Sequence, residues 1–240
     1  MTDKKEVGLF EDWLKRIVEH PLEAEKRRFI WEVMRSPFVE FHYSLLKDNS
    51  LDEQFRRDLM HRFNEHGEKA ETLLLSKLDN GEDKDFQADM IFLLGKMSKK
   101  HKATTLAYAR KFAESKNIYE RDRAIIVLGW IGTMEDTHIF ENHLLQDTDM
   151  HCRAWSASSF MQLWFKEESE MLKQKAFRVY KIALAAEKDY FVLSVILSAI
   201  REMGKTKLGI SQTALDELDT EKIDASKVKA LRFLDKALKS

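Results

Sequence analysis

The sequence predicts an all-α fold in which helices follow one another along the chain. Two observations favour it. The 240 residues include only two prolines and eight glycines, the residues that most often end helices and form turns. Apolar side chains also recur every three or four residues along most of the chain, as on the buried face of an amphipathic helix. Strands have no comparable support in this pattern.

Three helices are expected in residues 1–50, which we interpret as an N-terminal cap. They cover residues 5–19, 22–35 and 37–47. Pro21 and Pro37 are expected in the first turns of the second and third helices, where a missing N–H costs little. Ser36 is expected to cap the third helix at its N-terminus.

From residue 51 on, the same spacing predicts one helix after another. The expected helices are 51–65, 68–78, 84–97, 102–115, 119–132, 135–146, 150–166, 168–187, 190–203 and 225–239. The glycines at 67, 81 and 204 are expected to end helices, because glycine readily adopts a positive φ. Residues 205–224 carry no clear periodicity.

Three apolar segments align with one another. They read IFLLGKMS, IIVLGWIG and LSAIREMG, and they place Leu94, Leu128 and Ile200 in equivalent positions. These positions are about one and two repeats of roughly 36 residues apart, which is typical of a solenoid of helix pairs. The intervening segment RAWSASSFMQLW fits the register only loosely.

These segments resemble the HEAT-repeat family, in a short form similar to the phycobilisome-lyase type. The resemblance is carried by Arg123-Ala124, Leu128-Gly129 and Ile131-Gly132, with the matching Leu94-Gly95. It spans about residues 51–204 and implies a right-handed α-α superhelix of the armadillo type. Residues 1–240 would then form a single solenoid domain, with residues 205–240 as the C-terminal cap. Tetratricopeptide repeats have a similar period, but their Leu-Gly-x-x-Tyr run and later proline are missing.

The segment AIIVLGWI is apolar nearly all round, so we expect neighbouring helices to cover it on more than one side. Gly129 and the serines Ser158 and Ser159 are expected to allow two backbones to approach closely. Thr133 and Asp136 are expected to form a capping box at the start of helix 135–146.

The composition limits the possible partners. The chain has 40 basic and 41 acidic residues and a formal charge of −1, whereas domains that neutralise phosphates are usually strongly basic. Nucleic acid is therefore possible but disfavoured. The longest apolar runs are about nine residues, well below the roughly 20 that span a bilayer, and the charged N-terminus does not read as a signal peptide. We expect a cytoplasmic protein that does not bind membranes.

The motifs of common active sites and cofactor sites are missing. The segment Glu135–His138 matches E-x-x-H only once, and His138 and His143 are five residues apart, which does not place them on one helix face. Adjacent residues such as His151 and Cys152 point about 100° apart on a helix and do not make a catalytic dyad. We expect no metal, no cofactor and a buried, inert cysteine.

Three tryptophans, Trp130, Trp155 and Trp164, lie at helical spacing among apolar residues. A tryptophan in that setting is more often part of the core than a platform for stacking a base or sugar. Trp155 is the exception, because it stands beside Arg153 among small residues and is expected to reach the surface.

In HEAT-like proteins the second helix of each pair lines the concave face. Carried onto this sequence, the resemblance implies that helices 102–115, 135–146 and 168–187 offer exposed polar side chains there. The expected partner-binding residues are Arg110, Lys111, His138, Glu141, Asn142, Lys175 and Arg178, with Trp155 added for its exposure. Further exposed positions are expected at His101, Thr104, Thr105, Lys173 and Lys181.

The function that these observations favour is non-enzymatic protein binding, as a scaffold or adaptor. Two alternatives stay open. The first is a DNA-binding HEAT-like enzyme of the alkylpurine glycosylase type, which would need a basic groove, an exposed aromatic pair and an acidic residue. The second is an inhibitor or immunity-type protein that sequesters one toxin or effector.

Overall fold

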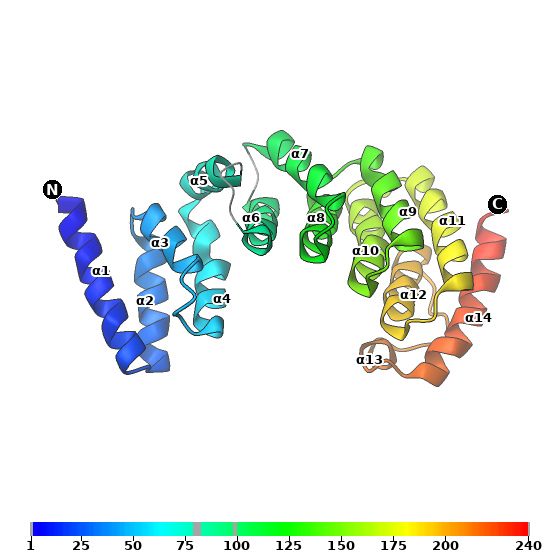
Figure 1. The fold of residues 1–240 in the computed structure, drawn as a ribbon. Helices are drawn as coiled ribbons and strands as arrows, with labels where there is room; N and C mark the ends of the chain where they lie inside the picture. The colour runs from blue at the N-terminus through cyan, green and yellow to red at the C-terminus, as the bar shows by residue number, and fades with distance from the viewer. Residues whose placement is uncertain (1, 79–82, 98–99, 240) are drawn as a thin grey trace. The chain divides into compact units, whose positions relative to one another are not determined.

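The computed structural model of the protein describes residues 2–78, 83–97 and 100–239. Every regular element in these ranges is helical, and no strand occurs among them. The prediction of an all-α fold is confirmed. The chain divides into two compact units, residues 1–101 and 102–240 (unit 1 and unit 2), and in each unit the helices follow one another in chain order (Figure 1). The predicted pair of helices 84–97 and 102–115 is divided between the two units.

Unit 1 is built around buried aromatic and aliphatic side chains. Its elements are α1 (Thr2–Glu19), α2 (Glu23–Arg35), α3 (Val39–Leu46), α4 (Glu53–Arg62), the 3-10 helix η1 (Phe63–His66), α5 (Glu68–Leu78) and α6 (Lys84–Met97). Phe29, Leu59 and Phe63 are fully buried where α2, α4 and η1 pack together. Helix α1 packs on α2 and buries Ile17, and it leaves Leu9 64% exposed.

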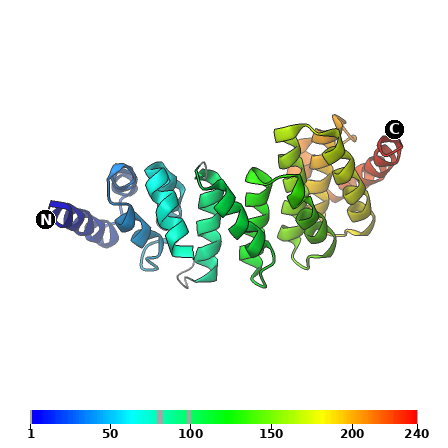
Figure 2. The same ribbon diagram turned by 90° about the horizontal axis from the view of Figure 1, so that it is seen from above.

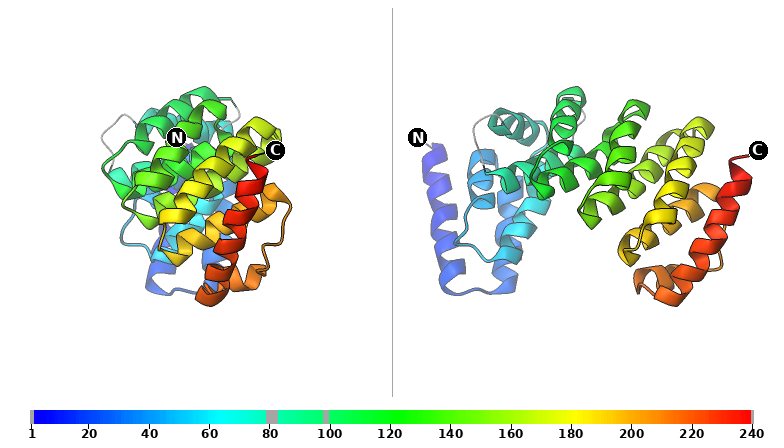
Figure 3. Two further views of the ribbon diagram at one scale, coloured as in Figure 1. Left: turned by 90° about the vertical axis from the view of Figure 1, so that its right-hand side faces the viewer. Right: turned by 45° about the vertical axis from the view of Figure 1, so that its right-hand side comes forward.

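Unit 2 arranges its helices in two rows. Its elements are α7 (Lys102–Ala113), α8 (Ile118–Ile131), the 3-10 helix η2 (Met134–Asp136), α9 (Thr137–Gln146), α10 (Met150–Glu167), α11 (Glu170–Ala186), α12 (Tyr190–Gly204), α13 (Gln212–Asp216) and α14 (Thr220–Ala237). Helix α10 packs between α8 and α12 to form one row, while α9 packs on α11 and α11 on α14 to form the other (Figures 1 and 2). Helix α14 lies alongside both α11 and α12 (Figure 3).

The row of α8, α10 and α12 begins each helix in the same way. The side chains of Asn117, Asp149 and Asp189 each accept hydrogen bonds from backbone N–H groups in the first turn. Such a cap stabilises a helix by about 1 kcal/mol. The three caps are 32 and 40 residues apart, so they mark the repeat directly. Asp52 caps α4 in the same way, and Asp83 accepts from the backbone N–H groups of Asp85 and Phe86 in the first turn of α6.

The expected close approach at Gly129 is confirmed. A Cβ atom placed on Gly129 would lie 2.6 Å from Oγ and 3.0 Å from Cα of Ser159. Ser159 is buried and donates a hydrogen bond of 2.9 Å to the carbonyl oxygen of Ile125. The capping box of Thr133 and Asp136 is confirmed as well, at the start of η2. Helices α8 and α10 therefore pack with little space between their backbones.

The predictions at the two prolines are wrong in detail. Helix α2 begins at Glu23 and α3 at Val39, so each proline precedes the helix instead of entering its first turn. Ser36 does not cap α3. Its hydroxyl donates to the carbonyl oxygen of Val33, and it lies at the C-terminus of α2. Residues 36–38 therefore form a connection between α2 and α3, and their side chains belong to neither helix.

The C-terminal prediction also changes. Gly67 ends η1 with a φ of 58°, as expected, but α12 includes Gly204 and the left-handed residue is Lys205. The uncertain segment 205–224 contains α13 and the first residues of α14, which begins five residues earlier than predicted. The expected helix end at Asn80-Gly81 lies outside the described residues.

Candidate partner-binding surfaces

The predicted binding residues occupy both rows of unit 2. Seven of them lie on α7, α9 and α11, and Trp155 lies on α10 in the other row. Lys111, His138, Asn142 and Arg178 are exposed, while Arg110, Glu141, Lys175 and Trp155 are half-buried. Thr105, expected at the surface, is buried.

Arg110 joins α7 to the next repeat. Its Nε lies 2.6 Å from Oδ1 of Asp136 and its Nη2 lies 3.3 Å from Oδ2. Asp136 is fully buried and also accepts the backbone N–H of Thr133. Because a buried carboxylate needs such partners, the Arg110 guanidinium is part of the fold, although its side chain stays 41% exposed.

Lys175 and His138 also make contacts within unit 2. Lys175 Nζ donates to Thr137 Oγ1 at 2.8 Å and lies 3.8 Å from Glu141 Oε2, so it connects α11 to α9. His138 Nδ1 donates to the carbonyl oxygen of Glu135 at 2.6 Å. The contact within the E-x-x-H motif is therefore made by the His138 ring and the backbone carbonyl of Glu135.

An exposed stripe on α11 runs along the same row. Met171 is 67% and Ile182 56% exposed, and together with Lys175 and Arg178 they are spaced i, i+4, i+7 and i+11 on one helix face. The basic residues of this stripe were predicted from the sequence, whereas its two apolar members were not. Large apolar side chains that stay exposed next to a cation are typical of a contact surface.

Cys152 is buried, as predicted. It is fully shielded from solvent on α10, and burial together with the nearby Asp147 and Asp149 carboxylates raises the pKa of its thiol well above the usual value. Because the thiolate is the reactive form, Cys152 is held in its unreactive state.

A hollow in unit 1 was not predicted from the sequence. It is a cleft of about 1650 Å³ whose walls come from the α2–α3 connection and α3 on one side and from η1 and α5 on the other. Seven apolar side chains line it, together with charged and hydroxyl groups. The apolar set is Val7, Met34, Pro37, Phe38, Val39, Phe41 and Leu73.

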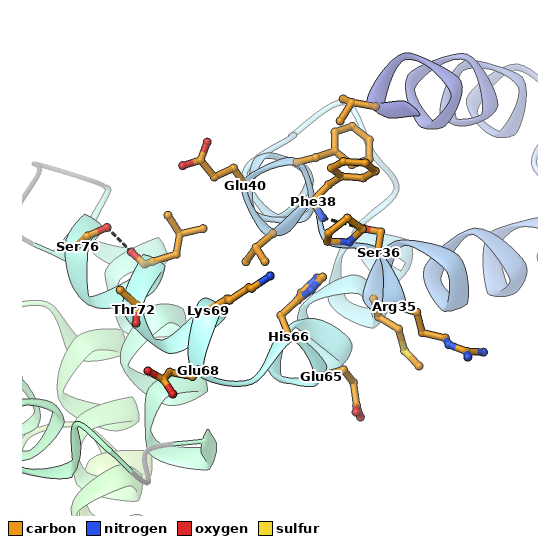
Figure 4. A pocket seen from close by; sticks show the side chains of 16 residues that line it. Arg35, Ser36, Phe38, Glu40, Glu65, His66, Glu68, Lys69, Thr72 and Ser76 are labelled. Carbon is orange, nitrogen blue, oxygen red and sulfur yellow. Dashed lines mark hydrogen bonds between the residues drawn. The ribbon is translucent and has the colours of Figure 1, made fainter. Parts of the chain in front are cut away.

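Figure 4 shows how the polar side chains of the cleft lie. His66 and Lys69 extend from η1 and α5 toward the segment that carries Ser36 and Phe38, while Glu65 and Glu68 point away from it. Pro37 and Phe38 could have indicated this cleft from the sequence. They did not, because these residues were interpreted as the first turn of a helix and not as a connection.

A histidine pair, His42 and His66, lies beside the cleft, and His66 lines it. His42 is fully buried and its Nε2 lies 3.0 Å from the carbonyl oxygen of Leu59. Since a carbonyl only accepts, His42 carries its proton on Nε2, and its Nδ1 accepts from Nε2–H of His66 at 2.9 Å. Burial, and then the neighbouring His66, lower the pKa of His42 to about 3. Burial and Lys69 lower the pKa of His66.

This pair predicts acid sensitivity of unit 1. Unfolded histidines have a pKa of about 6.5, so the unfolded chain takes up protons that the folded pair does not. The stabilisation is present in full above about pH 6.5 and is lost as the pH falls toward about 3. Hydrogen–deuterium exchange of α3 peptides, corrected for the intrinsic rate, should report faster opening at pH 5 than at pH 7.

Variants of two histidines test the assignment. His66→Gln should reduce the pH dependence of exchange in α3 without abolishing it, because the buried His42 remains, whereas His61→Gln, on the exposed face of α4, should leave it unchanged. Equal opening at pH 5 and pH 7 in the unmodified protein would contradict the neutral pair.

A second hollow surrounds Trp155 in unit 2. Its volume is about 380 Å³ and it lies between α10, α12 and α13. The rings of Trp155 and Phe191 meet edge to face, with centroids 5.9 Å apart and planes at 84°. The expectation that Trp155 reaches the surface agrees with its half-buried side chain, whereas Trp164 is buried.

Comparison of the chain with family models, curated proteins and solved structures found no match. The likeness to HEAT repeats therefore remains a resemblance carried by the residues quoted above. Among the described residues, none of the helices combines the length and apolarity needed to cross a membrane.

Proposed function

We propose that this protein is a non-enzymatic protein-binding scaffold, built as a right-handed HEAT-like solenoid of helix pairs, and that it holds a segment of its partner in the cleft of unit 1. The cleft is the observation that carries the proposal. Its volume of about 1650 Å³ exceeds the roughly 300–1,000 Å³ of small-molecule sites, so a stretch of polypeptide suits it better than a metabolite.

The chemistry of the cleft supports a protein segment. Apolar side chains such as Phe38, Phe41 and Leu73 offer a surface for apolar anchors, and protein interfaces place such anchors at their centre with polar groups at the rim. The charged lining residues are of both signs: Arg35 and Lys69 are basic, and Glu40, Glu65 and Glu68 are acidic. This favours an amphipathic segment with mixed charges over a phosphate backbone.

The predicted surface on α7, α9 and α11 is the second choice for the same function. Two of its basic residues, Arg110 and Lys175, are bonded within unit 2, which reduces what they offer a partner. The three other residues of the α11 stripe, Met171, Arg178 and Ile182, are exposed and offer a smaller contact.

Site-specific photo-cross-linking in the native host tests the proposal. A benzoylphenylalanine at Thr72 of α5 and another at Glu40 of α3, both exposed and both lining the cleft, should yield the same discrete adduct, identified by mass spectrometry. The matched control is Gln54, an exposed residue of α4 outside the cleft, which should yield none.

The position Arg178 separates the two surfaces. An adduct from Arg178 with none from Thr72 or Glu40 would move the contact to α11 and overturn the assignment to the cleft. The absence of a discrete adduct at all three positions would contradict protein binding by these surfaces.

A further inference from the structure

We propose that the hollow around Trp155 is a pocket for a basic side chain, arginine in preference to lysine, of a protein that contacts unit 2. The pocket combines an aromatic pair, an apolar wall and a single carboxylate. Its lining residues are Trp155, Ser158, Met161, Phe191, Ser194, Val195, Ser198, Gln212, Leu215, Asp216 and Leu218.

The charge of the lining selects a cation. Asp216 is the only charged residue that lines the pocket. A carboxylate has about four acceptor positions, and Gln212 Nε2 uses one of them at Oδ1, at 2.8 Å. Arg201 donates to the other end of the same amide, Gln212 Oε1, at 3.3 Å, and does not line the pocket. The carboxylate is thus oriented by Gln212 and retains acceptor positions.

The aromatic pair supplies the second feature that a cation uses. A cation over the face of tryptophan is attracted by the ring electrons, and arginine makes this contact more often than lysine. Trp155 is held in place by its edge-to-face packing on Phe191. A ring that is already fixed loses little freedom when a ligand binds.

The size and the apolar wall fit the stem of the side chain. A volume of about 380 Å³ lies at the lower end of ligand pockets. Met161, Val195 and Leu215 cover the methylene groups, as apolar surface commonly does for the stems of basic residues. A planar guanidinium then reaches both a carboxylate, through paired N–H groups, and an aromatic face, which an ammonium does less well.

The pocket lining includes a residue in the left-handed region, at the C-terminal end of α13. Leu218 lines the pocket with a φ of 53° and is 37% exposed. A bulky non-glycine residue in the left-handed region costs free energy, and such residues gather at binding sites. The hollow, the oriented carboxylate and the left-handed Leu218 that ends α13 therefore lie at one place.

Nuclear magnetic resonance of the full chain tests the pocket with defined probes. The probes are Nα-acetyl-arginine methylamide, the lysine analogue, and the neutral norleucine analogue, titrated at constant ionic strength. The indole N–H signal of Trp155, assigned with the Trp155→Phe variant, should shift saturably with arginine, more weakly with lysine and not with norleucine.

Two matched variants decide the role of the carboxylate. Asp216→Asn should weaken arginine binding roughly fivefold or more, the size of an ion-pair contribution, whereas Glu217→Gln, the exposed neighbour outside the pocket, should change nothing. Equal shifts with all three probes, equal effects of the two variants, or no saturable shift would overturn the proposal. The pocket lies in unit 2, so this outcome is independent of cross-linking in the cleft of unit 1.

Discussion

Replacing Gly129 by leucine is expected to destabilise unit 2 by more than about 3 kcal/mol. The first added carbon would already lie 2.6 Å from Ser159 Oγ and 3.0 Å from the Ser159 backbone. A backbone atom cannot rotate away, so α8 and α10 would have to move apart, and close-packed interiors tolerate such overpacking poorly. Urea unfolding followed by circular dichroism measures the loss.

Three comparisons make the Gly129 result specific. Gly8→Leu on α1, where nothing lies within 4 Å of an added Cβ, should not destabilise and should gain slightly from helix propensity. The milder Gly129→Ala should be partly rescued by Ser159→Gly, which removes both side-chain atoms in the way. It should not be rescued by Ser159→Ala, because the Cβ at 2.9 Å remains. Unchanged stability in Gly129→Leu would contradict the close packing of α8 on α10.

The helices and the close approach at Gly129 were predictable because both depend on local pattern. Apolar spacing fixes which side of a helix is buried, and a glycine in an all-apolar segment indicates a near neighbour. The repeat was harder to follow through residues 150–187, because α11 has 17 residues where α9 has 10. The caps at Asn117 and Asp149 would have kept the register, since they mark where each repeat begins.

The roles of the charged residues were harder to predict from the sequence. Arg110 lies in a basic cluster of the sequence, and its partner Asp136 is 26 residues away. Nothing in the local pattern distinguishes an arginine that binds the next repeat from one that faces solvent. The cleft was missed for a related reason: its walls come from segments on either side of α4, and only the packing of η1 and α5 against α3 brings them together.

Two arginines repeat one contact along unit 2. Arg121, near the start of α8, donates to both carboxylate oxygens of Asp147 at 2.9 Å. Arg153, in the equivalent place on α10, does the same to Glu187 at 2.7 and 3.3 Å. Each guanidinium also donates to two backbone carbonyl oxygens in the preceding loop. Each arginine thus links the loop before its own helix to the corresponding loop of the next repeat.

Asp147→Ala is therefore expected to cost about 3–5 kcal/mol, the usual effect of removing one partner from a buried ion pair. The side chains of Asp147 and Arg121 are only 3% and 13% exposed, so the arginine would stay buried without its counter-charge. Asp147 also accepts from His143 Nδ1 at 2.8 Å and from the backbone N–H of Asp149 at 2.9 Å. Urea unfolding at pH 7 measures the loss, and a cost below about 1 kcal/mol would place this pair with ordinary surface ion pairs.

The paired replacement and the pH profile separate charge from packing. Replacing both partners, Arg121→Met with Asp147→Leu, should recover much of the loss, because no buried charge is then left alone. Burial opposes ionisation of Asp147, but hydrogen bonds from Arg121, Asp149 and His143 outweigh it and lower its pKa to about 2. The stabilisation is therefore complete above about pH 4, the pKa of an unfolded aspartate, and is lost as the pH falls toward 2. Asp147→Asn should lack this part of the acid dependence, and the same acid slope in that variant would assign it to other carboxylates.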